Sequence, residues 1–254
     1  MNLQFDENLA TGYKKATQRI RVMSETWAVN NLFCPCCGKE RIIKLPNNAP
    51  VADLICENCN EIFELKSKKN KFGKKISDGA YATAVERIKS STNPDLLALL
   101  YNERLQVTDL QILPKYFFVP SILEKRKPLS NTARRAGWVG CNILYSEIPV
   151  QGKVTIIQNG TWIDREAVCE AYSNSKAIQI NSIEMRGWLI DVLNCVNSIK
   201  YTEFTLQDVY KRVNSLKEKH PTNNNIEAKI RQQLQLLRNK GFLLFLGNGR
   251  YRKI

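Results

Sequence analysis

The side chains best suited to chemistry lie in a fourteen-residue stretch of this sequence, from Asp53 to Lys66. It reads Asp-x10-Glu-x-Lys, so that Glu64 and Lys66 stand two residues apart. Because side chains alternate between the faces of a β-strand, these two would share one face, while Phe63 and Leu65 point into a core. A carboxylate and an ammonium group would then stand together. Oxygen ligands around Mg2+ can activate water and stabilise charge on a phosphate, which is what phosphodiester cleavage needs.

Each of these residues has an expected role. We expect Asp53, Glu64 and the main-chain carbonyl of Leu65 to hold the magnesium ion. Lys66 would polarise or deprotonate the attacking water, or neutralise the pentavalent phosphorane. The alternative is a surface ion pair between Glu64 and Lys66, worth at most about 1 kcal/mol. The spacing alone does not choose between the two interpretations.

Four cysteines frame the same segment with the spacing of a zinc site. A Cys-x2-Cys pair, Cys34 and Cys37, is followed after eighteen residues by a second, Cys56 and Cys59. Four thiolates at this spacing close a tetrahedral structural zinc site and leave no coordination position open for catalysis. A fifth cysteine, Cys36, lies inside the first pair. The spacing therefore also allows a Cys34/Cys36 or a Cys36/Cys59 choice.

The apolar pattern predicts the elements that position these residues. An apolar stripe from Leu9 to Trp27 recurs at threes and fours and predicts a first helix. Strands are expected at residues 51–55 and 61–66 around a zinc-pinned turn, followed by an exposed lysine-rich loop at 66–75. A helix is expected at 80–89, and further strands at 96–101, 107–113, 116–119 and 154–157. Strands mixed with helices at this spacing indicate an α/β (α+β) fold, a sheet layered with helices.

The composition changes near Asn181, and residues 182–254 hold +7 of the formal charge of +14. Their apolar pattern predicts three helices and a turn-linked hairpin. The helices are expected around residues 188–196, from the capping box of Thr205 and Asp208 to His220, and over 225–240, with the hairpin at 242–254. Three helices followed by a basic hairpin are typical of a winged helix, a helix-turn-helix variant. We therefore expect two domains, residues 1–181 and 182–254.

The third of these helices carries residue types that contact DNA. Opposite its apolar stripe lie Arg231, Gln232, Gln235 and Arg238. Such side chains reach phosphates and base edges in a major groove. On the hairpin, Arg250, Arg252 and Lys253 would add phosphate contacts. The alternative is a solvated helix face beside a basic tail, but helix and hairpin agree in charge, and we expect DNA binding.

The net charge and the lengths of the apolar runs indicate which partners and which compartment to expect. The net charge of +14 and the isoelectric point near 9.5 favour a polyanionic partner, either nucleic acid or an anionic membrane. No apolar run approaches the roughly 18 residues of a spanning helix, and the first residues lack the features of a signal peptide. We expect a soluble cytoplasmic protein without a membrane partner. No G-x4-G-K-[ST] loop occurs, so we expect no nucleotide cofactor, and we expect a monomer.

Several blocks of the sequence resemble the PD-(D/E)xK nuclease superfamily and, nearly end to end, the DpnI-type methyl-directed restriction endonucleases. The blocks lie at residues 50–53, 63–69, 78–83, 132–138, 140–142 and 229–235. The resemblance implies the superfamily core with an embedded structural zinc site, followed by a winged helix. It also implies a Mg2+-dependent enzyme that cuts double-stranded DNA at 5'-GATC-3' only where the adenine is N6-methylated. The superfamily's Pro-Asp pair is not adjacent here, because two residues separate Pro50 from Asp53.

Recognition of a methylated adenine calls for an apolar surface. An N6-methyl group places apolar surface in the major groove and removes one donor hydrogen. Trp138 stands in a basic segment with Arg134 and Arg135, and nearby glycines favour a loop. We expect Trp138 to meet the methyl group or to wedge the duplex, with these arginines on the DNA. The alternative is an ordinary core tryptophan.

Two other functions compete with cleavage. A zinc-stabilised reader of methylated DNA would use the same winged helix without catalysis, and Mg2+ would be irrelevant to it. A winged-helix transcriptional regulator would fit residues 182–254 but would leave Asp53, Glu64 and Lys66 unexplained.

Overall fold

The structure, a computed structural model, describes residues 2–40, 42–46, 52–90 and 92–254. Their contacts divide the chain into two compact units, Met1–Ser146 with Gln151–Lys176 and Glu147–Val150 with Ala177–Ile254. The predicted division into domains after residue 181 stays a prediction. Among the described residues, every helix is too short or too polar to cross a membrane.

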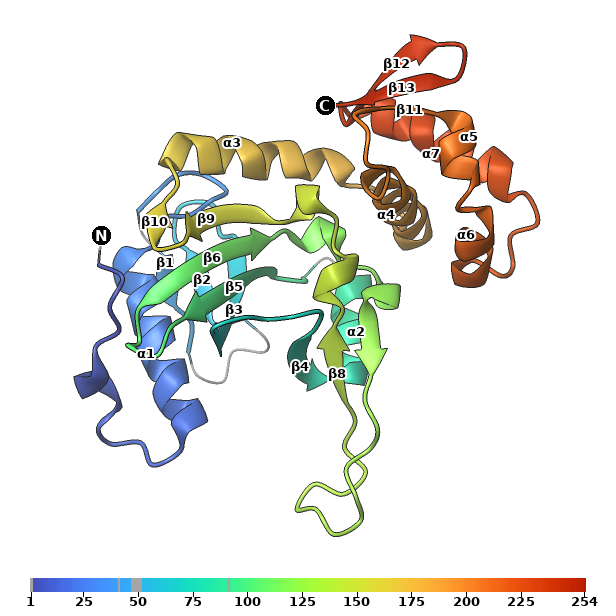
Figure 1. Cartoon of the computed structure of the whole chain (residues 1–254). Helices are drawn as coiled ribbons and strands as arrows, with labels where there is room; N and C mark the ends of the chain where they lie inside the picture. The colour runs from blue at the N-terminus through green and yellow to red at the C-terminus, as the bar shows by residue number, and fades with distance from the viewer. Residues whose placement is uncertain (1, 41, 47–51, 91) are drawn as a thin grey trace. The chain divides into compact units, whose positions relative to one another are not determined.

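The first unit is built around a seven-stranded sheet in the order β1-β2-β3-β5-β6-β9-β10. Its strands are β1 Ile42–Lys44, β2 Leu54–Cys56, β3 Ile62–Lys69, β5 Asp95–Tyr101, β6 Val107–Leu113, β9 Val154–Gln158 and β10 Thr161–Trp162. The pair β3 and β5 is parallel and its neighbours are antiparallel. Figure 1 shows the curvature of this sheet. The mixed sheet with its helices confirms the predicted α/β (α+β) class.

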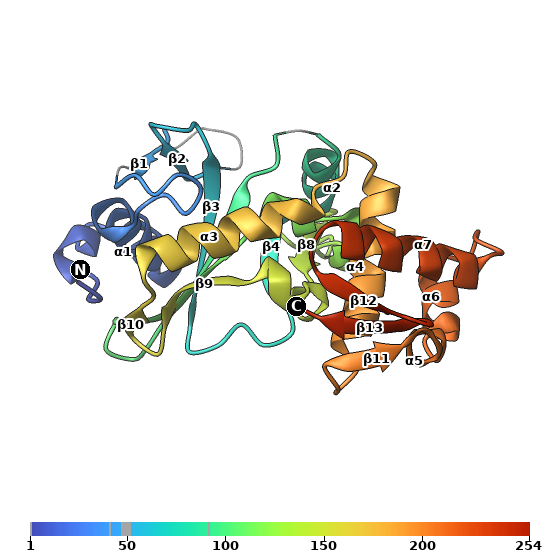
Figure 2. The same ribbon diagram turned by 90° about the horizontal axis from the view of Figure 1, so that it is seen from above.

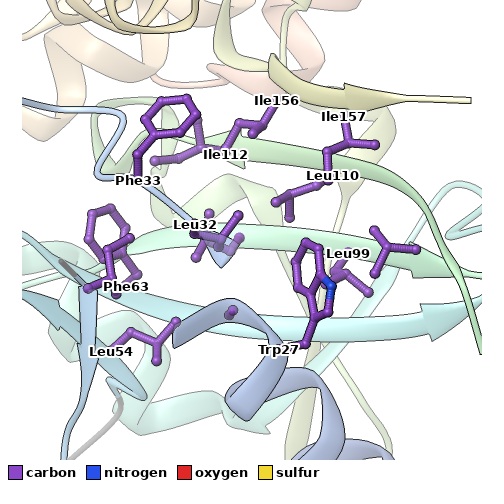
Figure 3. Packing of buried hydrophobic residues seen from close by; sticks show 14 of the residues in the cluster. Trp27, Leu32, Phe33, Leu54, Phe63, Leu99, Leu110, Ile112, Ile156 and Ile157 are labelled. Carbon is purple, nitrogen blue, oxygen red and sulfur yellow. The ribbon is translucent and has the colours of Figure 1, made fainter. Parts of the chain in front are cut away.

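Two helices, α1 Ala16–Asn31 and α3 Arg165–Ser175, share the main hydrophobic core with this sheet. Seen from above, α3 lies across the strands (Figure 2). Trp27 of α1, Phe63 of β3 and Leu110 of β6 all belong to this core and are almost fully buried (Figure 3). Burying one such side chain contributes about 1.5–3 kcal/mol. The core thus fixes β3 and α1, the two elements on which the candidate site depends.

A second, three-stranded sheet completes the first unit. Its order is β4-β8-β7, with β4 Ile76–Ala80, β8 Gly140–Ile143 and β7 Leu123–Lys125. The helix α2 Tyr81–Lys89 follows β4 directly. The segment between β7 and β8 runs out from this sheet as a long loop (Figure 1). Short 3-10 helices lie at Glu7–Ala10, Lys115–Phe117, Pro120–Ile122, Tyr145–Glu147, Val150–Gly152 and Lys176–Ile178.

The second unit has the predicted winged-helix architecture. Its elements are α4 Ile183–Asn197, β11 Glu203–Thr205, α5 Leu206–Tyr210, α6 Val213–Lys219, α7 Ile226–Asn239, β12 Leu243–Gly247 and β13 Arg250–Lys253. The strands pair in the order β11-β13-β12 (Figure 2). The predicted capping box at Thr205 and Asp208 is present. Trp188 of α4 and Leu234 of α7 are buried in the core of this unit.

Two predictions near the N-terminal half were wrong. The first helix begins at Ala16, and Leu9 and Tyr13, which continue its stripe, are exposed. Leu9 lies in a separate 3-10 turn and Tyr13 in the link before the helix, with Gly12, a poor helix former, between them. The predicted strand at residues 116–119 runs instead from the end of one 3-10 turn, Lys115–Phe117, to the start of another, Pro120–Ile122, because Pro114 and Pro120 flank it and interrupt a strand ladder.

Three further boundaries differ from the prediction. Strand β3 continues to Lys69, where a loop was expected, because β5 pairs with it in parallel as far as Tyr101. The second helix of the winged unit is divided into α5 and α6, with Lys211 and Arg212 in the break. Strand β2 begins at Leu54, while Pro50 and Val51 lie outside the described residues.

Candidate active site and zinc cluster

Asp53 lies at a fork between two strands. β2 and β3 pair only at Leu54 with Phe63 and at Ile55 with Ile62. At the fork, the main-chain N–H of Asp53 donates to the carbonyl of Phe63 at 2.9 Å. One step further, the side chain replaces a strand partner, because its Oδ2 accepts from the N–H of Leu65 at 2.9 Å. The carboxylate is thereby held beside the Glu64-Leu65 peptide, at the edge of β3 that β2 leaves open.

Glu64 and Lys66 share the face of β3 opposite the core, as predicted. The ammonium of Lys66 donates to Glu64 Oε1 at 2.5 Å and to Asp78 Oδ1 of β4 at 2.8 Å. The side chains of Lys66, Glu64 and Asp78 are only 24%, 17% and 13% exposed. The geometry therefore differs from that of a solvated surface pair.

The electrostatics of this cluster favour a cation. Burial raises the pKa of Glu64, the Lys66 charge opposes that rise, and the Asp78 and Asp53 charges add to it. Burial alone would lower the pKa of Lys66, but Glu64 and Asp78 raise it above its ordinary value. Lys66 is therefore positively charged here, and the carboxylates outnumber it.

A cavity of about 680 Å³ opens beside the cluster. It follows the open edge of β3 and is lined by α1, the end of β1, the fork and β4. The charged residues in its lining include Arg21, Glu25, Lys44, Asp53, Glu64 and Lys66. This cavity is large enough to admit part of a polynucleotide backbone, with the predicted catalytic residues on its wall.

The donor set beside the cavity fits a hard divalent cation. Asp53 and Glu64 offer carboxylate oxygens. Burial and the neighbouring negative charges disfavour the ionised form of Glu64, and a bound cation would stabilise that form. The carbonyl of Leu65 belongs to the same stretch of strand. These three residues suit Mg2+, which takes oxygen ligands and keeps several waters.

The four predicted cysteines come together in the first unit. The Sγ atoms of Cys34, Cys37, Cys56 and Cys59 all lie within 4.8 Å of one another. Cys34 to Cys59 and Cys37 to Cys56 are each 3.6 Å apart. A zinc ion with Zn–S bonds near 2.3 Å needs S–S distances of roughly 3.8 Å, so the group could hold zinc.

Cys36, which lies inside the first pair but outside this group, has a different partner. The Sγ of Cys36 accepts from the ammonium of Lys176 at 3.1 Å. Of the alternatives that the spacing left open, the geometry favours the set without Cys36.

Both cysteine turns are built in the same way. The residue after each pair, Gly38 or Asn60, has a positive φ of 73° or 58°. Its N–H donates to the carbonyl of the first cysteine of the pair, at 2.8 Å for Cys34 and 2.9 Å for Cys56. Glycine and asparagine are the residues that tolerate this conformation. Cys56 also ends β2, which begins directly after Asp53, so the cysteine cluster and the fork share one short strand.

Trp138 lies at the base of the long loop between β7 and β8, where it is partly buried. Its ring lies against Gly140, where an added Cβ would stand 2.8 Å from two ring atoms. The guanidinium of Arg135 stacks 4.9 Å from the ring centroid, and Arg134 is exposed beside it. The loop position matches the prediction for these three residues.

The predicted DNA-contact residues of the second unit are open to solvent. Arg231, Gln232, Gln235 and Arg238 of α7 are all exposed, as are Arg250 and Arg252 of β13. Three of these arginines have protein partners, and Arg238 donates to the side-chain oxygen of its neighbour Asn239 at 3.1 and 3.2 Å. Arg231 donates to the hydroxyl of Tyr210 at 2.6 Å, and Arg252 pairs with Glu203 at 2.7 Å.

Three charged residues that contact the predicted ones or their partners were not predicted from the sequence. Asp78 holds Lys66 from a different sheet, which no local spacing reveals. Arg21 and Glu25 stand four residues apart on α1 and pair at 2.5 Å. An acidic residue on the inner face of a predicted helix was the available signal.

Comparison with protein families covers nearly the whole chain. The model of the Dam-replacing family, DpnI, matches residues 1–181, which hold the fork, the cavity and the cysteine cluster. The model of the Dam-replacing HTH domain matches residues 184–253.

Proposed function

This chain belongs to the Dam-replacing (DpnI) family, and we propose that it is a Mg2+-dependent restriction endonuclease of double-stranded DNA. Its sites would be 5'-GATC-3' sequences with N6-methylated adenine, and it would act as a monomer. The observation that carries the proposal is the cluster of Asp53, Glu64 and Lys66 at one cavity. The family match supports a methyl-dependent restriction enzyme, and this cluster supports hydrolysis as its chemistry.

Each residue of the cluster would have its own task in hydrolysis. A bound Mg2+ would supply an activated water and stabilise negative charge on the scissile phosphate. Asp53 and Glu64, with the carbonyl of Leu65, would hold it. The hydrogen bond from Leu65 keeps Asp53 oriented before substrate arrives. Such preorganisation spares the site a reordering step during the reaction.

Lys66 would stabilise the phosphorane through its positive charge. Its pKa is raised, so an acting ammonium group fits this site better than a neutral amine that abstracts a proton. Asp78 touches neither water nor phosphate in this scheme. It would position Lys66, because it holds the ammonium from the side opposite Glu64.

Two parts of the chain would read the DNA. Trp138, with Arg134 and Arg135 beside it, would supply the apolar surface that an N6-methyl group favours. The exposed face of α7 and the β13 arginines would contact the duplex from the second unit. Replacing Trp138 with alanine should reduce the preference for methylated over unmethylated duplex. An unchanged preference for methylated duplex would show that Trp138 does not recognise the methyl group.

One experiment separates cleavage from mere reading of methylated DNA. Plasmid with and without N6-methyladenine in its 5'-GATC-3' sites is incubated with the protein in Mg2+ or in EDTA. We expect cutting only of methylated plasmid and only in Mg2+. Binding of methylated DNA without cutting in either buffer would favour the non-catalytic reader, and cutting in EDTA would contradict the metal-dependent mechanism.

A further inference from the structure

One carboxylate on α1 joins two cations on the wall of the cavity. Glu25 is 2% exposed. Its Oε1 accepts from Arg21 Nε at 2.5 Å, and its Oε2 pairs with Lys44 Nζ of β1 at 2.6 Å. The cations themselves are open to solvent, since the side chains of Arg21 and Lys44 are 57% and 37% exposed. A buried carboxylate thus fixes two accessible positive charges.

The position of these cations relates them to the proposed chemistry. Arg21, Glu25 and Lys44 all line the cavity that contains Asp53 and Glu64. Arg21 Nη2 stands 3.5 Å from Asp53 Oδ1. A phosphate that reached Asp53 would therefore meet the guanidinium of Arg21 as its nearest charge on the α1 side.

The other lysines in the cavity lining are held by partners other than Glu25. Lys66 is held between Glu64 and Asp78. Lys68 donates to the carbonyl of Phe72 at 3.4 Å, and Lys69 pairs with Glu103. Three carboxylates, Glu25, Asp53 and Glu64, line the same cavity and would repel a polyanion. Binding of DNA in this cavity therefore needs cationic side chains whose N–H donors can face the phosphate.

Arg21 and Lys44 have such donors. A guanidinium carries five N–H groups and an ammonium three, so the bonds to Glu25 leave donors available. We propose that Arg21 and Lys44, held by Glu25, bind backbone phosphate of the DNA next to the bond that is cut. This Arg21-Glu25-Lys44 clamp deepens the proposed nuclease function and rests on it. Arg21 and Lys44 would contact substrate, and Glu25 would position them.

Salt dependence of binding tests the clamp without relying on cleavage. The affinity for a methylated 5'-GATC-3' duplex is measured with Ca2+ in place of Mg2+, at about 50 to 300 mM salt. Arg21→Ala and Lys44→Ala should each weaken binding by roughly tenfold. Each should also make the negative slope of log affinity against log salt less steep by about 0.9. Arg19→Ala is the matched control, because Arg19 lies on the same helix but does not line the cavity. Its slope should equal that of the wild type.

Three further variants test the roles of Arg21 and Glu25 and guard against misfolding. Arg21→Lys keeps the charge and should retain the wild-type slope, whereas Arg21→Gln should lower it. Glu25→Gln keeps both cations, so the slope should stay, but the single-turnover cleavage rate in Mg2+ should fall about tenfold because the cations are no longer fixed. Thermal unfolding of each variant shows whether it is folded.

The outcomes separate the clamp from the nuclease proposal. A wild-type protein that never cuts DNA contradicts the nuclease proposal, whatever the slopes. A wild-type protein that cuts, with equal slopes for Arg21→Gln, Lys44→Ala and the control, overturns the clamp. Faster cleavage by Arg21→Gln would also overturn it, since Arg21 would then obstruct Asp53.

Discussion

Asp53 accepts a 2.9 Å hydrogen bond from the main-chain N–H of Leu65 through one carboxylate oxygen. That bond ties the carboxylate to the open edge of β3, where the pairing with β2 has ended. The other oxygen lies near Arg21 on the cavity side. One side chain thus completes the strand and, in the proposed mechanism, would present a metal ligand, and these two tasks can be separated by mutation.

Asp53→Asn and Asp53→Ala should have equal effects on cleavage and different effects on stability. The amide oxygen of asparagine can still accept from Leu65, so the free energy of unfolding should change little. Alanine leaves that N–H without its acceptor, which should cost about 1 kcal/mol. Both variants should lose cleavage, because neither supplies the charge that Mg2+ prefers. Urea unfolding without added Mg2+, beside plasmid cleavage in Mg2+, checks both, and an Asp53→Asn variant that cuts normally would refute the ligand role.

Zinc content should depend on four cysteines and not on the fifth. Cys34→Ser should lower bound zinc from one equivalent and destabilise the first unit, because a structural zinc contributes directly to folding. Cys36→Ser is the matched control, since Cys36 contacts Lys176 and lies outside the cluster. Elemental analysis and thermal unfolding measure both effects. Full zinc in Cys34→Ser, or its loss in Cys36→Ser, would show that the ligand set is different.

Asp95 gives the first unit a pH-dependent stability. It accepts from Tyr172 Oη at 2.5 Å and from the N–H of Lys115 at 2.7 Å. Burial, with the Glu61 charge, raises its pKa from 3.8 to about 6. A raised carboxyl pKa means that the folded state favours the protonated form. Ionisation of Asp95 therefore lowers the free energy of unfolding as pH rises from about 4 to 6, by on the order of 3 kcal/mol.

Asp95→Asn removes this ionisation and should flatten the profile. The wild type and the variant should be similar near pH 4, and the variant should become the more stable as pH rises from about 4 to 6. Urea unfolding at intervals from about pH 4 to 8 measures the difference. A difference independent of pH would mean that Asp95 does not titrate in this range.

The two arginines of β13 should differ in their effect on DNA affinity. Arg250 is exposed, whereas Arg252 is held by Glu203 at 2.7 Å and must loosen that pair to reach a phosphate. Arg250→Ala should weaken duplex binding by roughly tenfold and lower the salt slope by about 1. Arg252→Ala should lose less of the duplex affinity than Arg250→Ala does. Glu203→Gln should raise the affinity, and an equal or larger loss for Arg252→Ala would reverse this ranking.

Local patterns in the sequence predicted most of the elements. The strand β5 followed from a continuous apolar run, and α7 from a stripe whose members Ile226, Ile230, Leu234 and Leu237 are all buried. The same rule failed at Leu9 and Tyr13, because their spacing does not register Gly12, which lies between them and ahead of the start of the helix at Ala16. The break between α5 and α6 was missed for a similar reason, since Val213 keeps the apolar rhythm across it.

The candidate site was predictable only where its residues are close in sequence. Glu64, Lys66 and the paired cysteines stand at short, recognisable spacings. Asp78 and Lys66 belong to strands of different sheets, and Glu25 meets Lys44 across a helix and a strand. These contacts depend on how α1 and β4 pack beside β3. Pair spacing in a single sequence carries no record of that packing.

The Lys66→Ala variant tests most directly whether the cluster of Asp53, Glu64 and Lys66 hydrolyses DNA. Single-turnover cleavage of a methylated 5'-GATC-3' duplex in Mg2+ is compared with binding of the same duplex in Ca2+. Lys68→Ala is the control, because Lys68 is two residues along the same strand and donates to a main-chain carbonyl. We predict that Lys66→Ala loses at least about 10³-fold in cleavage rate while its affinity stays within about threefold. Cleavage by Lys66→Ala at the rate of the Lys68→Ala control would contradict the account.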